Sequence, residues 1–195
     1  QVQEVAHQQP RQPARHLALL AGRTVLGGYL AAHGAQKLFG SFDGRGIEAT
    51  AAGFDHLGLR PGSVFARVAA ASELGGGLLT AAGAADPIGP VVLAATMAVA
   101  SSTHRANGPF TAKGGYELPL TNMAAALALG VAGPGRLSVD GMIAKPIPTS
   151  VRAMVVAGAI VVGAASLAMV LRASPPAPPS AEPVAAAGEE PDISA

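Results

Sequence analysis

Three ionisable side chains interrupt an apolar stretch near the N-terminus that otherwise has the character of a membrane helix. The stretch covers residues 15–39, and the three side chains are Arg23, His33 and Lys37. An arginine or lysine near the middle of a bilayer costs roughly 2.5–3.5 kcal/mol, so such residues usually face a bundle interior, a water-filled cavity or the interface. We therefore expect these three side chains to find polar partners elsewhere in the chain.

Helical geometry places the three ionisable groups on one side of this stretch. At about 100° per residue, Lys37 lies about 40° from Arg23 and about 40° from His33. The opposite side is expected to meet lipid and carries four apolar residues: Val25, Leu26, Tyr29 and Ala32.

The composition is that of a membrane protein rather than of a soluble domain. Of the 195 residues, 50% are hydrophobic and 13% are charged, whereas soluble domains carry about 25% charged residues. The net charge is +1 and no basic run is present, which argues against a nucleic-acid interface. The chain has no cysteine, so disulfide exchange and cysteine-bound iron–sulfur clusters are excluded, and redox chemistry would need a partner or a cofactor.

Apolar segments predict an all-α fold, a polytopic membrane helix bundle with five transmembrane helices. The segments are 15–39, 63–85, 88–103, 118–131 and 153–171, with a short amphipathic interfacial helix at 47–57. A signal peptide is an alternative reading of the first segment, but Arg23 interrupts it and four further apolar segments follow. The predicted organisation is a disordered arm at 1–14, a four-helix membrane domain at 15–140, a loop and fifth helix at 141–172, and a disordered Pro, Ala and acidic tail at 173–195.

Antiparallel spans would bring polar side chains from four helices to one membrane face. These side chains are His33 and Lys37 at the end of the first span, Glu73 within the second, His104 after the third and Glu117 before the fourth. The opposite connection, between the second and third spans, offers only Asp86. The asymmetry predicts a polar pocket that opens toward one interface.

Several of these residues also have a purely structural explanation. Lys37 can extend to the interface as an ordinary cation at a helix end, or it can pair with Glu73. A Glu73 carboxyl group inside a membrane would either stay protonated or form an ion pair with a cation. His33 and His104 could bind a metal or haem, carry protons, or simply be held by structural hydrogen bonds. Because two histidines from different helices are weak evidence for a metal, we predict neither a metal nor a haem.

Arg23 and Glu117 leave similar alternatives open. Arg23 could be partnered by Asn122, by hydroxyl groups of the third span or by lipid phosphate. Glu117 could serve only to stabilise the N-terminus of the fourth helix, where a negative charge is favourable.

Five short motifs together resemble the DoxX family of small bacterial membrane proteins. They are His-Gly-Ala-Gln-Lys-Leu-Phe at 33–39, Ser-Glu-Leu-Gly-Gly-Gly at 72–77, His104 at the end of the third span, Gly-Tyr-Glu-Leu at 115–118, and Gly-Pro-Gly-Arg-Leu-Ser-Val-Asp at 133–140. The resemblance covers about residues 19–140 and leaves the fifth span and the tail outside.

The resemblance implies a four-helix unit in the bacterial inner (plasma) membrane, within an oxidoreductase system. Relatives include membrane subunits of thiosulfate:quinone oxidoreductase. An actinobacterial relative resembles part of a complex with a superoxide dismutase and a thiosulfate sulfurtransferase, so soluble enzymes of that kind are the expected partners in oxidative stress. The lipid bilayer is the other partner, and a homo-oligomer is compatible with the sequence.

Two hypotheses follow for the function. In the first, the chain is a membrane subunit of a quinone-linked oxidoreductase, with Glu73 and His104 as catalytic residues that handle protons and with His33, Lys37, Arg23 and Glu117 as binding residues for a quinone cofactor. In the second, it is a non-catalytic membrane anchor or scaffold for a redox complex. A small-solute permease is a third reading.

Overall fold

The computed structural model describes residues 12–143 and 148–172, and every regular element within them is helical. The helices in chain order are α1 (Gln12–Phe39), α2 (Gly46–His56), α3 (Gly62–Ala82), α4 (Ile88–Thr103), the 3₁₀ turns η1 (Arg105–Asn107) and η2 (Thr111–Lys113), α5 (Glu117–Ala132), α6 (Val139–Met142) and α7 (Thr149–Arg172). The predicted all-α class is confirmed for this part of the chain.

The helix bounds follow the apolar segments closely. The third predicted segment coincides with α4, whereas α1 begins at Gln12 rather than at residue 15, and α6 was not expected. The predicted tail at 173–195 and residues 1–11 of the predicted arm lie outside the described residues.

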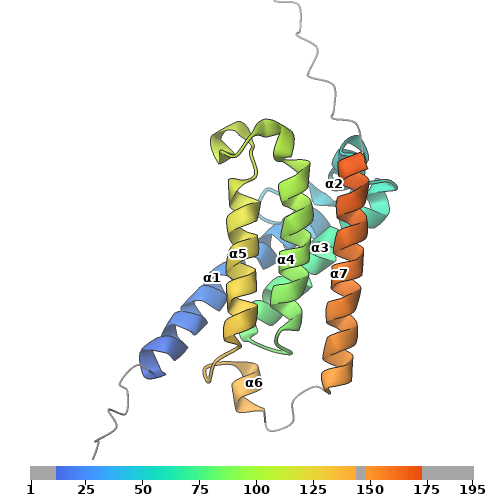
Figure 1. The fold of residues 1–195 in the computed structure, drawn as a ribbon. Coiled ribbons are helices and arrows are strands. Elements are labelled where there is room, and N and C mark those ends of the chain that lie inside the picture. Colours follow the sequence, from blue (N-terminus) through green and yellow to red (C-terminus); the bar gives the residue numbers. More distant parts are fainter. Residues whose placement is uncertain (1–11, 144–147, 173–195) are drawn as a thin grey trace, which may run out of the picture.

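The connections between the helices gather at two opposite ends of the molecule. Figure 1 places α2 and the connection from α4 to α5 at its upper end, and α6 and the turn from α3 to α4 at its lower end. In the same view α4, α5 and α7 run side by side, and α4 packs against α3, α5 and α7. These two ends hold two separate groups of polar side chains.

Glycine lets α1 and α3 approach backbone to backbone. A Cβ added at Gly27 would lie 2.5 Å from the carbonyl oxygen of Gly77 and 2.6 Å from the amide nitrogen of Ala81. About two turns closer to the C-terminus of α1, Gly34 lies against the backbone of Ala70 and Leu74. Small residues at such a crossing permit dense packing where larger ones would separate the helices.

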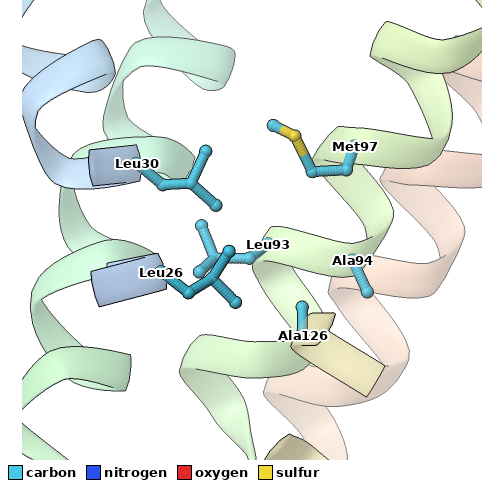
Figure 2. Close-up of a cluster of buried hydrophobic side chains, with 6 residues drawn as sticks. All are labelled: Leu26, Leu30, Leu93, Ala94, Met97 and Ala126. Carbon is cyan, nitrogen blue, oxygen red and sulfur yellow. The ribbon is translucent and has the colours of Figure 1, made fainter. Parts of the chain in front are cut away.

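The central core lies where α1, α4 and α5 meet. It consists of Leu26, Leu30, Leu93, Ala94, Met97 and Ala126 (Figure 2). The expectation that Leu26 meets lipid is therefore wrong, because its side chain is buried. Val25 and Tyr29 are exposed, as expected. The difference is geometric: Leu26 falls within the stripe of α1 that also contains Leu30.

Length and apolar character single out one helix of the described residues, Thr149–Arg172, as able to cross a membrane unaided. Helices α4 and α5 are apolar but have 16 residues each. Helix α1 has 28 residues and contains Arg15, Arg23 and Lys37.

Candidate functional site

A cavity of about 400 Å³ lies between α1, α2, α3, α4 and α7. Its walls are mainly apolar and include Phe54 from α2, Phe65 from α3 and Val99 from α4. The residues of α7 whose side chains the structure describes and that line the cavity are small, such as Gly158 and Gly163. This cavity is the site at which three of the predicted polar residues come together.

An ion pair between Lys37 and Glu73 forms the polar end of the cavity. Lys37 Nζ donates to Glu73 Oε2, so the pair joins α1 to α3. The Glu73 side chain is 5% exposed and the Lys37 side chain 28%. A buried carboxylate with a cationic partner avoids most of the cost of an isolated buried charge.

His104 lines the same cavity from the end of α4. Its Nδ1 lies 2.9 Å from the carbonyl oxygen of Gly114, and the Asn107 side-chain amide donates to that same oxygen over 3.0 Å. A carbonyl oxygen can only accept a hydrogen bond, so Nδ1 carries a proton. The loop that follows α4 therefore fixes both the position and the tautomer of this ring.

Two threonines that line the cavity were not predicted from the sequence. The Thr96 hydroxyl donates to Val92 O over 2.9 Å, and the Thr103 hydroxyl donates to Ala100 O over 2.8 Å. Such bonds to the preceding turn are common in helices, so the threonines carry no signal that separates them from other helical hydroxyls. Only their neighbours in space identify them.

His33 and Glu117 do not line the cavity. His33 is exposed and bonds Gln36 of its own helix over 3.0 Å between Nδ1 and Oε1. Glu117 is exposed and is the first residue of α5, where its negative charge is favourable. The structure therefore places neither residue in the cavity that Lys37, Glu73 and His104 line.

Arg23 lies away from the cavity and is 2% exposed. Its guanidinium donates to Leu137 O over 2.5 Å and to Ala81 O over 3.4 Å. The partners are backbone carbonyls, and none of the proposed partners of Arg23 accounts for these bonds. Arg23 thus fastens the segment before α6 to the α1–α3 pair.

A second polar group occupies the lower end of the molecule, around the connection between α3 and α4 in which Asp86 was the one polar residue noted. Asp140 accepts hydrogen bonds of 2.8 Å from the backbone N–H groups of Ala85 and Asp86. Arg152 of α7 lies 3.5 Å from Asp140 Oδ2. The Leu-Ser-Val-Asp run at 137–140 therefore holds the turn between α3 and α4 in place.

Electrostatics at this end affect Asp86 most. Burial, followed by the nearby carboxylate of Asp140, raises the pKa of Asp86 to about 6, although Arg152 and Arg23 oppose the shift. Protonation of Asp86 as the pH falls through about 6 would relieve the repulsion between the two carboxylates.

No group of three His, Cys, Asp or Glu side chains is gathered in a metal-binding arrangement within residues 12–143 and 148–172. His104 has its Nδ1 committed to a carbonyl, and Glu73 is committed to Lys37. The described polar side chains of the cavity can take part in hydrogen bonding and proton exchange.

Comparison with known proteins gives a family for the part of the chain that builds the cavity. A family model described as DoxX matches residues 18–106, a segment that contains Lys37, Glu73 and His104 but not Glu117 or α7. No curated protein and no solved structure matches the chain. The match confirms the resemblance for the three motifs that lie within residues 18–106, and it assigns this segment of the chain to the DoxX family.

Proposed function

We propose that this protein is a multi-pass membrane subunit of an oxidoreductase system and that its cavity binds the ring of a quinone-type lipid. Membership of the DoxX family indicates a membrane protein associated with oxidoreductase systems. The observation that carries the proposal is the Lys37–Glu73 ion pair inside an otherwise apolar cavity that also contains His104.

Outward-facing apolar side chains support more than one membrane-spanning helix. Exposed examples on α1, α5 and α7 are Val25, Tyr29, Leu127, Val131, Met154 and Ile160. A continuous exposed apolar surface is unfavourable in water and indicates contact with a membrane or a partner. We propose that α1, α3, α4, α5 and α7 are the five spans, in the inner membrane of a bacterium.

The lengths of α4 and α5 set a condition on this arrangement. At about 1.5 Å per residue, a helix of 16 residues is about 24 Å long, shorter than a typical hydrocarbon core of about 30 Å. A short span is accommodated by local thinning of the bilayer at modest cost. Burial of α4 between α3, α5 and α7 also removes much of its surface from lipid.

The cavity has the chemistry that a quinone ring requires. Its apolar walls suit a ring with an attached tail, whereas Lys37, Glu73 and His104 supply polar contacts at defined positions. Reduction of such a ring takes up two electrons and two protons, and imidazole and carboxylate groups can carry protons. The electrons would come from a soluble redox partner, such as a sulfurtransferase or superoxide dismutase system, since the chain holds no cysteine.

Photocrosslinking tests the proposal directly. The full chain in lipid nanodiscs is irradiated with a photoreactive alkylquinone, and the modified peptides are identified by mass spectrometry. We expect labelling of peptides that line the cavity, and we expect Ala100→Phe to abolish it by filling the cavity. Ala128→Phe on the exposed side of α5 is the matched control. Unchanged labelling in a folded Ala100→Phe variant would show that the quinone does not occupy the cavity.

A non-catalytic anchor is the second candidate, and one observation favours it. The Lys37–Glu73 pair joins α1 to α3 directly, so it can stabilise the helix bundle by itself. Deleting residues 173–195 leaves every described helix in the chain. Loss of a co-purifying redox enzyme from this variant, in a protein that shows no cavity labelling, would favour the anchor.

A further inference from the structure

We infer that the cavity prefers a ring that donates hydrogen bonds, a hydroquinone or a phenol, over the corresponding quinone. This inference rests on the proposed function and specifies the ligand at the same site. It comes from the polar atoms that the cavity presents, because most of the side chains with a defined hydrogen-bonding role can only accept.

His104 is an acceptor in its neutral form. Its Nδ1–H is used by Gly114 O at 2.9 Å, and this leaves Nε2 with a lone pair and no proton. The carbonyl that holds Nδ1 is itself fixed by the Asn107 amide. A ligand that meets Nε2 must therefore bring a donor.

The two threonine hydroxyls present the same chemistry. Thr96 and Thr103 have each given their single proton to a carbonyl of the preceding helical turn. Their oxygens retain only lone pairs for a ligand, unless the helix bond is broken. Both residues line the cavity on α4, as does His104 after the end of that helix.

The opposite side of the cavity combines an acceptor with a donor. Glu73 uses Oε2 for Lys37, so Oε1 is available as an acceptor. Lys37 has further N–H bonds to donate, and the Ser72 hydroxyl can donate or accept.

These roles discriminate between the two redox forms of a quinone-type ring. A quinone carries two carbonyl acceptors, so one can meet Lys37 while the other faces acceptors on α4. A ring hydroxyl can accept from Lys37 and also donate to Glu73 or His104. A polar group left unpaired on burial costs enough to lower affinity by about tenfold or more.

Matched ligands test this preference without any redox step. A 4-alkylphenol and its methyl ether share ring and tail but differ in the donor, and binding of each to the full chain in nanodiscs is measured at about pH 8, where an ordinary imidazole is neutral. Empty nanodiscs correct for partition into lipid. We expect the phenol to bind about tenfold more tightly or better. The corresponding alkylhydroquinone, kept reduced, should likewise bind more tightly than the alkylquinone.

Removal of the acceptors provides the structural control. The Thr96→Val/Thr103→Val double variant keeps side-chain shape but loses both oxygens, so the ratio of phenol to ether affinity should fall. Thr121→Val is the matched control, because Thr121 is exposed on α5, bonds its own helix and does not line the cavity. It should leave the ratio unchanged.

The outcomes separate this inference from the proposed function. Equal binding of phenol and ether, or tighter binding of the quinone, overturns the donor preference but leaves the quinone site intact. Binding of none of the four ligands above the level of empty nanodiscs overturns both. A clear preference that persists unchanged in the double threonine variant shows that the two threonine oxygens do not cause it and overturns that part of the inference.

Discussion

The Lys37–Glu73 ion pair joins two helices at the position where the cavity begins. Removing one partner leaves the other with an uncompensated charge, which is more costly than removing both. The wall that α1 and α3 form in the cavity therefore depends on an ion pair between two residues 36 positions apart in the chain.

Lys37→Met should lower the free energy of unfolding by about 1–3 kcal/mol. Breaking a fully buried pair costs more, about 3–5 kcal/mol, but the Lys37 side chain is 28% exposed, so water can partly compensate for its loss. The Lys37→Met/Glu73→Leu double variant should be more stable than Lys37→Met alone. Thermal or denaturant unfolding in detergent measures both, and Lys113→Met on an exposed turn is the control. A double variant less stable than the single one would contradict the argument.

Asp86 should make stability depend on pH in a defined direction. Because its folded-state pKa is raised from 3.8 to about 6, the folded protein binds more protons than the unfolded chain between these values. Stability should therefore fall as pH rises from about 4 to about 6, and stay at the lower level above that range. Comparison of unfolding midpoints at about pH 5 and about pH 7.5 measures the effect.

The Asp86→Asn variant isolates this contribution to the pH dependence. It keeps the backbone N–H that bonds Asp140 and removes the titrating group, so its midpoint should vary less over the same range. Asp43→Asn, at an exposed position, should behave like the unchanged protein. An identical pH profile for Asp86→Asn and the unchanged protein would contradict the assignment.

Single residues also show how far the sequence could predict the site. Burial and charge balance indicated that Glu73 needs a cation, and Lys37 was one candidate, with extension of Lys37 to the interface as the alternative. Helical angles placed His33 and Lys37 about 40° apart on one side of α1, but they did not show which of them faces α3 until Gly27 and Gly34 marked that face. The bonds of Arg23 to Leu137 and Ala81 depend on a loop whose path no local pattern specifies.

Helix α3 uses its three consecutive glycines for different contacts. Gly77 faces α1. A Cβ added at Gly76 would lie 3.2 Å from Leu93 Cδ2 of α4, whereas a Cβ added at Gly75 would have no neighbour within 4 Å. The sequence predicted close packing here but not which helix each glycine would meet. Helix α6 was missed because its four residues depend on the docking of Asp140 and on the Ser138 cap rather than on helix propensity.

Adjacent glycines in α1 give a matched test of this packing. Gly27→Ala should destabilise the protein by about 1–3 kcal/mol, because the new methyl group meets the α3 backbone. Gly28→Ala, with open space around it, should be neutral or stabilise by up to about 1 kcal/mol. Unfolding of both variants in the same detergent measures the difference. Similar effects of the two changes would show that the α1–α3 contact is not as close as described.

The whole molecule has a polar group at each end and an apolar surface between them. The cavity and its ion pair belong to the upper part, and the Asp86–Asp140–Arg152 group belongs to the lower end. The sequence predicted the order of the long helices but assigned nearly all the polar residues to one end. Long-range contacts of residues 137–140 correct that assignment, and they could not be inferred from spacing.

Cysteine labelling distinguishes five spans from one, because the chain has no native cysteine. Ala49→Cys and Ala112→Cys place a thiol at the upper end, and Ala82→Cys and Met142→Cys place one at the lower end; all four positions are exposed. If α1, α3, α4, α5 and α7 all cross the membrane, an impermeant maleimide should label the first pair from one side of oriented vesicles and the second pair from the other.

A single span through α7 gives the opposite result, because all four positions precede α7 and would be labelled from the same side. Ala124→Cys, exposed near the middle of α5, is the internal control. In a five-span protein this thiol faces acyl chains, so it should react only after detergent is added. If α7 is the one span, this thiol lies in water and should react before detergent is added. The apolar surface of α1 and α5 would then have to be covered by a partner instead of lipid.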